Sequence, residues 1–345
     1  MRSGACEISD QWTYRGMRVV WMENELIKVG ILVDRGSDIF EFRAKKQDVN
    51  VLLRLPKGIL NPNQIQSQIR DTPNQMEDYY YGGWQECLPN SAPLNYRGAH
   101  LGQHGEVWMI PWQHAIIEDS AEKIALKVWT RPLRFPIMIE KVLTLERGSS
   151  ALTIDEKITN ESETILDLMW GQHIAFGLPW LEDGAKVITN AQDFYAEPKM
   201  PASRRFKPGV PGQWPDVMGA DGTMVNADLI PPSSAVPYSD LAYLSGFSEW
   251  AYYALQTDRL GFAVTWDPTI FSHLWYWQER FASQDAPWWG STYAVGLEPW
   301  TSPYFADPEK AVVDDKLFKI NPGEIISTKL SASIFEDDFE IPADF

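Results

Sequence analysis

The sequence predicts an all-β protein built from large antiparallel sheets. Short stretches in which apolar and polar residues alternate recur about 8–12 residues apart, and turn residues separate them. Convincing amphipathic helices are few. Together these features are typical of a sandwich or a barrel. The 345 residues show neither a repeat of fixed length nor a linker between two regimes of composition, so we expect one domain over residues 1–345.

The predicted strands fall into two series. In the first series, residues 26–33 alternate and end at the turn 34–36, and residues 39–44 continue with a period of two. This series covers residues 18–22, 26–33, 39–44, 114–119, 123–129, 138–145 and 151–160. The second series covers residues 250–255, 260–266, 271–277, 293–297 and 325–330.

Two stretches lack a strand pattern. Residues 61–78 are polar and rich in Gln and Asn, which predicts a loop or a short helix. Residues 196–240 hold many Pro, Gly, Ser and Asp residues with little periodicity. This second stretch is therefore predicted to be a long excursion on the surface.

Charge and composition restrict the partners. The formal net charge is −17 and no run is rich in Lys or Arg, whereas a nucleic-acid partner would need a basic surface. No apolar run approaches the ~20 residues of a membrane helix, and the first residues do not resemble a signal peptide. The two cysteines, Cys6 and Cys87, indicate free thiols in a reducing compartment. We expect a cytoplasmic protein that binds neither nucleic acid nor membranes, with a homodimer left open.

Tryptophan is unusually frequent, with sixteen residues in the chain. Core packing is one explanation, because aromatic side chains contribute much of the buried area of a protein. A sugar-binding surface is the other, because the C–H face of a sugar ring stacks on an indole. Both readings stay open for the tryptophans nearest the candidate site. Close pairs occur at Trp108 and Trp112, Trp275 and Trp277, and Trp288 and Trp289.

Two of the five histidines lie in segments suited to a functional site. Gly102 and Gly105 flank His104, so the backbone there can turn sharply and approach a ligand, although a solvated loop histidine would look the same. His173 follows the apolar residues 165–170 at a predicted strand end, where its pKa could be tuned to the working pH. The alternative for His173 is a hydrogen-bonded histidine of the core.

One acid stands in an apolar setting near the end of the chain. Glu298 follows a predicted strand and lies between Leu297 and Pro299, with Trp300 next. Desolvation there should raise its pKa and make it a base that works near neutral pH, and a buried salt bridge is the alternative. Two imidazoles and one carboxylate are what proton transfer on a sugar requires. We expect no metal and no cofactor, because the cysteines are far apart and no Gly-rich phosphate loop is present.

Taken in order, four segments resemble the aldose 1-epimerase (galactose mutarotase-like) superfamily. Residues 34–39 also resemble its divergent epimerase-like branch. The resemblance implies a β-supersandwich and a cofactor-free mutarotase that interconverts sugar anomers. It also implies that His173 is the general acid, that Glu298 is the general base and that His104 holds the sugar. The four segments are residues 82–90, residues 101–105 with Pro111 and Trp112, residues 171–178, and residues 296–301.

The resemblance extends to candidate substrate-binding residues, and at two positions this sequence differs from the pattern of the family. Gln172 stands where aldose epimerases often have Asn, and Glu106 follows the first His-Gly where phosphosugar relatives carry Arg. Arg204 and Arg205 could still bind an anionic group. An additional substrate-binding acid could be Asp240 or Asp267. The predicted substrate-binding residues are Trp108, Gln172, Trp275, Trp277, Asn90 and Arg35.

Two other functions remain open from the sequence. The same histidine and glutamate could remove a proton next to a carbonyl, as in an isomerase or lyase acting on a keto-sugar. A sugar-binding protein without catalysis is the third hypothesis, because a fold does not dictate a function. The sequence does not say whether the sugar is neutral or carries a phosphate, sulfonate or carboxylate.

Overall fold

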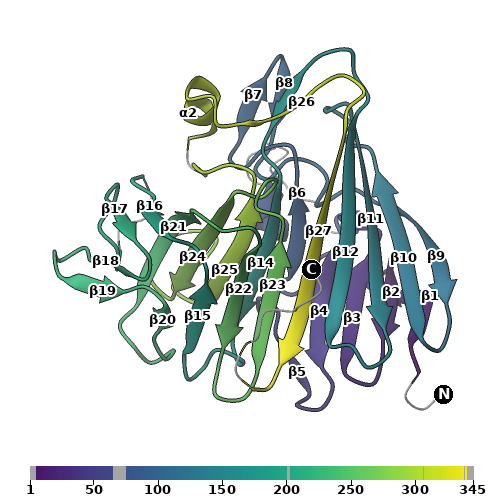
Figure 1. Ribbon diagram of the computed structural model, residues 1–345, viewed down its shortest axis with the longest axis horizontal. Coiled ribbons are helices and arrows are strands. Elements are labelled where there is room, and N and C mark those ends of the chain that lie inside the picture. Colours follow the sequence, from purple (N-terminus) through teal and green to yellow (C-terminus); the bar gives the residue numbers. More distant parts are fainter. Residues whose placement is uncertain (1–4, 65–74, 200–202, 306, 338, 340–345) are drawn as a thin grey trace.

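The computed structural model describes residues 5–64, 75–199, 203–305, 307–337 and 339. Two short helices occur in this part of the chain, α1 (Gln75–Tyr79) and α2 (Pro308–Val313), and strands dominate the rest (Figure 1). The prediction of an all-β protein with large antiparallel sheets is therefore confirmed. No helix among these residues is long and apolar enough to cross a membrane.

The larger sheet contains twelve antiparallel strands within the described ranges. Its order is β1-β2-β3-β4-β6-β14-β25-β24-β21-β16-β17, and β5 pairs with β4. Of four neighbouring strands in its middle, β24 and β25 follow one another in sequence, whereas β14 and β21 come from other parts of the chain. The strands are β1 (Glu7–Tyr14), β2 (Met17–Glu23), β3 (Ile27–Leu32), β4 (Asp38–Ala44), β5 (Val49–Asn50), β6 (Trp84–Cys87), β14 (Gly171–Gly177), β16 (Asp193–Ala196), β17 (Pro211–Gln213), β21 (Tyr238–Ser245), β24 (His273–Arg280) and β25 (Tyr293–Trp300).

Among the described residues the second sheet contains nine strands in the order β20-β15-β22-β23-β27-β12-β11-β10-β9. They are β9 (Gln113–Asp119), β10 (Lys123–Thr130), β11 (Ile137–Glu146), β12 (Ala151–Asn160), β15 (Ala185–Thr189), β20 (Leu229–Ile230), β22 (Ala251–Gln256), β23 (Gly261–Trp266) and β27 (Ile325–Phe335). The described residues also form three two-stranded sheets, which are β7 (Leu94–Tyr96) with β8 (Ala99–Leu101), β13 (Leu166–Leu168) with β26 (Phe318–Ile320), and β18 (Asp216–Met218) with β19 (Met224–Asn226).

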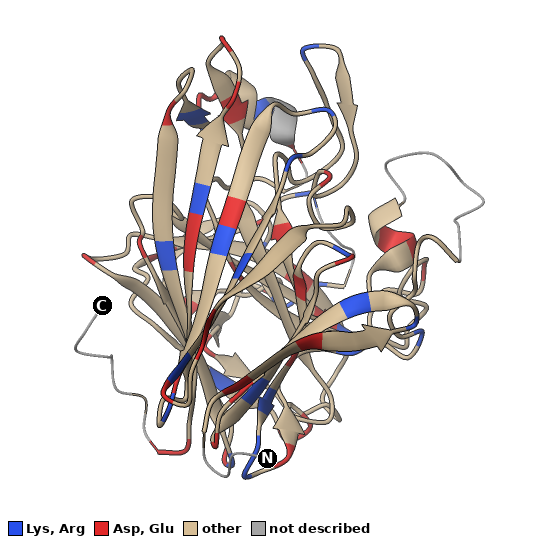
Figure 2. Ribbon diagram, turned by 90° about the vertical axis from the view of Figure 1, so that its right-hand side faces the viewer, with Lys and Arg blue, Asp and Glu red and all other residues tan. Residues whose placement is uncertain are grey.

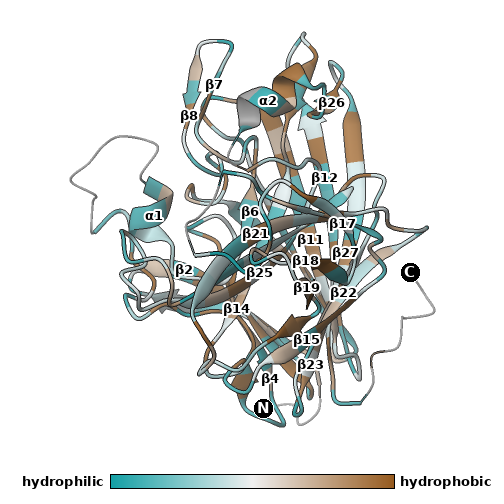
Figure 3. Ribbon diagram, turned by 90° about the vertical axis from the view of Figure 1, so that its left-hand side faces the viewer, coloured by the Kyte–Doolittle hydropathy of each residue, from teal (hydrophilic) through white to brown (hydrophobic). Residues whose placement is uncertain are grey.

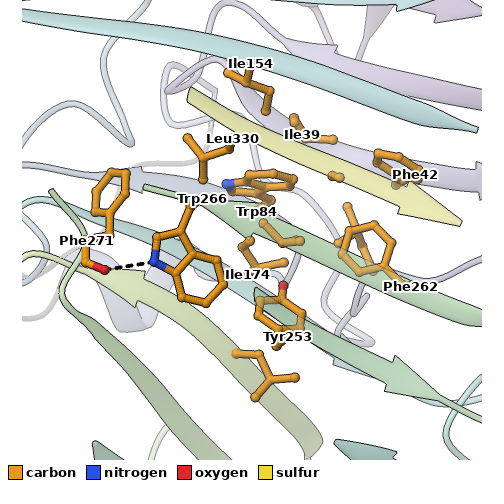
Figure 4. Close-up of a cluster of buried hydrophobic side chains, with 14 of the residues drawn as sticks. Ile39, Phe42, Trp84, Ile154, Ile174, Tyr253, Phe262, Trp266, Phe271 and Leu330 are labelled. Carbon is orange, nitrogen blue, oxygen red and sulfur yellow. Dashed lines mark hydrogen bonds between the residues drawn. The ribbon is translucent and has the colours of Figure 1, made fainter. Parts of the chain in front are cut away.

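The main hydrophobic core lies between the two large sheets. Buried and partly exposed residues alternate along most of strand β11. One face of this strand therefore packs into the core and the other face points outward. Phe42 of the larger sheet packs edge-on against Phe262 of the second sheet, with ring centroids 5.1 Å apart. Figure 4 shows this cluster, in which Ile39, Phe42, Trp84 and Ile174 come from the larger sheet and Ile154, Tyr253, Phe262, Trp266 and Leu330 from the second. The two sheets thus form a sandwich.

The outer face of the second sheet carries charged side chains. Glu140 on β11 pairs with Lys127 on β10 at 2.5 Å and with Lys157 on β12 at 2.9 Å. These side chains are partly exposed, and Figure 2 shows acidic and basic residues side by side on neighbouring strands. This face is therefore solvated, and the other large sheet provides the surface on which a site can form.

Most predicted strands are present, and the differences have physical causes. Strands β24 and β25 extend beyond the predicted ends at residues 277 and 297. Strand β14 was not predicted because all seven of its residues are buried, so its sequence does not alternate. The helix α1 begins within the polar stretch 61–78 and ends one residue beyond it, and residues 65–74 of this stretch fall outside the described ranges.

The excursion predicted over residues 196–240 contains more structure than expected. Outside residues 200–202, which the structure does not describe, it includes β17, the pair β18 and β19, the short strand β20 and the start of β21. The strands β17 to β20 are only two or three residues long. Strands this short carry too few residues to show a period in sequence.

Candidate active site

A cavity of about 540 Å³ lies on the face of the larger sheet that is turned away from the second sheet. Strands β14, β25, β24 and β21 form its floor, and residues from α1 line one side of it. Figure 3 shows α1 to the left of β21, β25 and β14. Ile174 packs in the core between the sheets, so its neighbour His173 must point to the opposite face. The cavity therefore receives every second residue of these strands, including His173, Trp275, Trp277 and Glu298.

Strand register brings the predicted acid and base together. Gly171 pairs with Trp300 and Ala175 with Gly296, which places His173 directly opposite Glu298 on the neighbouring strand. The distance between His173 Nε2 and Glu298 Oε1 is 3.7 Å. Their exposed fractions are only 7% and 2%, yet both residues line the cavity. Two groups from segments 125 positions apart thus share one wall of one cavity.

Burial controls the protonation of this pair. Desolvation raises the pKa of Glu298 to about 8, although the hydrogen bond from Trp300 lowers it. Desolvation also lowers the pKa of His173 to about 4. The desolvation expected for Glu298 is thus present, whereas burial places the pKa of His173 below the working pH that was expected for it. Between these two pKa values the pair holds a single proton.

His104 lies beside the pair in a tight turn. Its ring centroid is 5.0 Å from that of His173, and it lines the same cavity. Its φ is 62° and that of Gly105 is 71°. A methyl group on Gly105 would approach the carbonyl oxygen of Leu88 to 2.0 Å, so only glycine is accommodated there. Burial and the nearby His173 lower the pKa of His104 well below its usual range, which keeps the ring neutral.

Two of the predicted tryptophans form part of the cavity wall. Trp275 stacks on Trp300 with ring centroids 4.2 Å apart and an interplanar angle of 14°. Trp300 in turn donates from Nε1 to Glu298 Oε2 at 3.1 Å. Trp277 lies 6.1 Å from the ring of His173. Trp275 and Trp277 therefore occupy the positions expected of residues that contact a ligand.

Four other predicted ligands do not line the cavity. Asn90 donates to the carbonyl oxygens of Ala92 and Gly102, so it holds the turn that carries His104. Trp108 also supports this turn, by donating from Nε1 to the carbonyl oxygen of Gly105 at 3.0 Å. These side chains are used to fix backbone and do not reach into the cavity.

Arg35 also supports backbone. It donates to the carbonyl oxygens of Leu60 at 3.2 Å and Tyr79 at 2.7 Å, and its guanidinium lies over the ring of Tyr81. The bond to Tyr79 fixes the end of α1, next to the cavity residue Tyr80. Arg35 therefore holds this segment in place and does not line the cavity.

Gln172 faces the core between the sheets and joins a buried polar network. Its Nε2 donates to Glu86 at 2.9 Å and to Glu156 at 3.0 Å, and its Oε1 accepts from Trp84 at 2.7 Å. Glu86 also receives hydrogen bonds from Lys141 at 3.2 Å and from Trp170. Burial and the neighbouring Glu86 raise the pKa of Glu156 well above its usual range. The network lies directly behind His173, on the other side of β14.

The acidic and basic residues named as further candidate ligands lie outside the cavity. Asp240 accepts from the backbone N–H groups of Arg205 and Phe206, and Asp267 accepts from that of Thr269. Arg205 donates to the carbonyl oxygen of Leu229 and to Tyr238. None of these side chains, nor Arg204, lines the cavity.

Sequence reasoning missed several residues that line the cavity. They are Tyr80, Gln103, Ser239, Glu279, Asp285 and Trp288 among others. Trp288 belongs to a tryptophan pair that the sequence brought to attention, whereas Tyr80 and Glu279 gave no local signal. No group of three or more His, Cys, Asp or Glu residues in the described ranges is placed to hold a metal ion.

Solved structures share this architecture. A candidate aldose 1-epimerase from Klebsiella pneumoniae superposes with a TM-score of 0.71 at 14% identity over 96% of this chain and 83% of its own. A galactose mutarotase-like protein from Clostridium acetobutylicum gives a TM-score of 0.65 at 14% identity over 96% and 99% of the two chains. The protein therefore has the galactose mutarotase-like fold, as the sequence resemblance implied.

A family model identifies the chain more closely. It is described as a domain of unknown function, DUF4432, and matches residues 14–209. The chain belongs to this family. The matched range includes His104 and His173 but ends before Glu298. No curated protein sequence matches the chain.

Proposed function

We propose that the protein is a cofactor-free carbohydrate mutarotase, which interconverts the anomers of a sugar by opening and reclosing its ring. The observation that supports this most is the His173–Glu298 pair, 3.7 Å apart at the floor of a cavity large enough for a sugar. The fold shared with galactose mutarotase-like proteins supports it as well.

The spacing of the pair suits the chemistry of an anomeric carbon. That carbon carries two oxygens, the ring oxygen and the anomeric hydroxyl, which are close together because both bond to one atom. Two groups on one wall can each reach one of these oxygens within the ~2.6–3.2 Å of a hydrogen bond. Ring opening then removes the proton from the anomeric hydroxyl, forms the carbonyl, breaks the bond from the anomeric carbon to the ring oxygen and protonates that oxygen.

A single proton on the pair is sufficient for a full cycle. Opening takes one proton from the sugar at one partner and returns one at the other, so the proton of the pair moves from one residue to its neighbour. Rotation about the C1–C2 bond and reclosure from the other face move it back. The pKa values favour Glu298 as the partner that holds the proton at rest, with His173 neutral. The roles implied by the family, Glu298 as base and His173 as acid, require the other tautomer.

The remaining cavity residues hold the sugar. His104 is neutral and adjoins His173, so it is placed to hydrogen-bond the ring oxygen or a neighbouring hydroxyl. Trp275 and Trp277 offer apolar faces for the C–H side of the ring. These contacts would keep the anomeric carbon against the pair.

The test is the rate of anomer exchange. Nuclear magnetic resonance exchange measurements on a panel of aldoses should give rates above those of buffer for the wild-type protein, with the sugar recovered unchanged. Recovery of a different sugar, or of an unsaturated product, would indicate an isomerase or a lyase instead. Binding without any acceleration across the panel would contradict the proposal.

A glycine beside the pair provides a further test. A methyl group at Gly296 would lie 2.4 Å from Glu298 Oε1 and 3.2 Å from the ring of Trp277. We expect Gly296→Ala to displace the carboxylate and lower kcat/KM at least about tenfold, while the unfolding free energy falls by only about 1 kcal/mol, since the end of Glu298 can move. Gly212→Ala is the control, because its methyl group would meet Val217 at an ordinary 3.5 Å. Equal kcat/KM values for both variants would contradict the expectation.

A further inference from the structure

Three aromatic rings form a corner of the cavity, here called the aromatic corner: Tyr80, Trp277 and Trp288. Tyr80 lies 6.3 Å from Trp277 and 6.2 Å from Trp288, and the two tryptophans are 5.4 Å apart. The interplanar angles are 64°, 88° and 43°. The rings are thus not stacked, and they turn differently oriented surfaces toward the cavity. Such arrangements attract cations, because the face of an aromatic ring is electrostatically negative.

The acidic residues that line the cavity are Glu77, Glu279, Asp285 and Glu298, and no described Lys or Arg is among the lining residues. A phosphate, sulfonate or carboxylate on the sugar would meet only like charge here. A cationic group would meet the carboxylates of Glu77, Glu279 and Asp285, whereas Glu298 holds the proton of the catalytic pair.

Among these acids, Glu279 is the one that is buried without a cationic partner in the described part of the chain. It is 1% exposed, and its carboxylate accepts from the backbone N–H groups of Ala282 and Ser283 and from Ser283 Oγ. All three donors are neutral, and no ion pair to Glu279 occurs in the described part of the chain. Buried carboxylates are normally paired with a cation. The negative charge of Glu279 at the cavity wall is therefore available to a ligand.

Unpartnered polar atoms in the same cavity indicate that a polar ligand enters it. Tyr80 Oη, His104 Nδ1 and His173 Nδ1 are buried, and none has a hydrogen-bond partner among the described residues. Buried polar groups are rarely left unpaired in folded proteins. The hydroxyl and amino groups of a sugar would supply partners.

The geometry points to an amino sugar as the substrate, with its ammonium group at the aromatic corner and its anomeric carbon at the His173–Glu298 pair. The ring of Tyr80 lies 5.2 Å from that of His173, so the corner directly adjoins the pair and one sugar can contact both. This inference rests on the proposed mutarotase function and specifies its substrate class. Anionic sugars are excluded by the same acidic lining.

Four probes test the inference at pH 6.5. They are 2-amino-2-deoxyglucose, glucose, N-acetyl-2-amino-2-deoxyglucose and glucose 6-phosphate, each measured by anomer exchange. We expect kcat/KM for the amino sugar to exceed that for glucose about tenfold, because the ammonium group gains attraction from the carboxylates and the rings. The N-acetyl sugar, which lacks the charge, should lose this advantage, and the phosphate should be the poorest substrate.

Variants show whether the preference arises at the corner. Asp285→Asn and Trp288→Leu should each lower the ratio of amino sugar to glucose about three- to tenfold. Asp258→Asn removes an exposed acid from the turn between β22 and β23 and should leave the ratio unchanged. If kcat/KM of the wild-type protein is equal for glucose and the amino sugar, the inference is overturned and the mutarotase proposal stays intact.

Binding separates failure of the inference from failure of the proposed function. If no probe is turned over faster than in buffer, the mutarotase proposal fails, and tryptophan fluorescence titration then tests the inference alone. Tighter binding of 2-amino-2-deoxyglucose than of glucose would support an amino-sugar site. Equal or weaker binding would overturn it.

Discussion

Glu298→Gln is expected to lower the anomerisation rate by about 10²–10⁴-fold, because an amide can neither take up nor release the proton that the pair exchanges with the sugar. The amide is nearly the same size and can still accept from Trp300 Nε1, so the shape of the cavity should persist. His173→Ala should cause a loss of similar size. Because the two residues act as a unit, the double variant should be little slower than either single variant.

The control for this experiment is Glu249→Gln, which changes an exposed glutamate outside the cavity lining. It should keep the wild-type rate. The comparison must be made on a sugar whose binding is confirmed for every variant. Retention of the wild-type rate in both Glu298→Gln and His173→Ala would remove the pair from the mechanism.

The same substitution should stabilise the fold at alkaline pH. The folded-state pKa of Glu298, about 8, lies above the ordinary 4.5 of an unfolded chain. The stability that protonation of this carboxyl provides is therefore complete below about pH 4.5 and is lost as the pH rises through about 8. We expect Glu298→Gln to match the wild type near pH 4.5 and to gain up to about 5 kcal/mol in unfolding free energy at pH 9. Denaturant titrations at the two pH values would measure this, and an equal difference at both would contradict it.

Lys141→Met is expected to have the largest effect on stability. Lys141 is buried, its Nζ lies 3.2 Å from Glu86 Oε2, and it also lies over the ring of Trp112. Its removal leaves the charge of Glu86 buried next to a second carboxyl, that of Glu156. The unfolding free energy should fall by about 3–5 kcal/mol, as when one partner of a buried ion pair is removed. Denaturant titration measures the loss directly.

A surface pair on the neighbouring strand provides the control. Lys157 pairs with Glu140 at 2.9 Å, but its side chain is 42% exposed. Lys157→Met should therefore cost less than about 1 kcal/mol. Adding Glu86→Gln to Lys141→Met should recover part of the stability, because the unpaired charge is removed. Equal losses for the two lysines would show that the buried network does not depend on its cation.

The sequence predicted the fold better than it predicted the site. Strands such as β11 and β12 are buried on one face only, so their alternation is visible in the sequence. Strand β14 carries the most important histidine, yet it is buried on both faces and shows no alternation. Its existence depends on how the sheet is covered, which is a property of the whole fold.

The candidate site was predicted as far as the chemistry of single residues allows. The setting of Glu298 beside Pro299 and Trp300 correctly indicated desolvation, and the three predicted catalytic residues do lie in one cavity. Gln172 was predicted to bind the substrate because it stands where aldose epimerases often have Asn, next to His173. Successive residues of a strand point to opposite faces, so the side chain of Gln172 lies on the core side of β14 and not in the cavity.

The cavity walls depend on long-range packing and left no local signal. Tyr80 directly follows α1, and Glu279 lies in β24, whose partners are fixed by sheet register. Neither position differs in sequence from an ordinary aromatic or acidic residue. Only the assembled sheet places them around the His173–Glu298 pair.

The pH dependence of kcat/KM tests the central claim most directly. A pair that must hold one proton loses activity when a second proton binds His173 below about pH 4 and when the last proton leaves Glu298 above about pH 8. After subtraction of the rate in buffer, and with folding verified at each pH, we predict a bell-shaped profile with a plateau between these values. A profile that keeps rising from pH 6 to pH 10 would contradict the account.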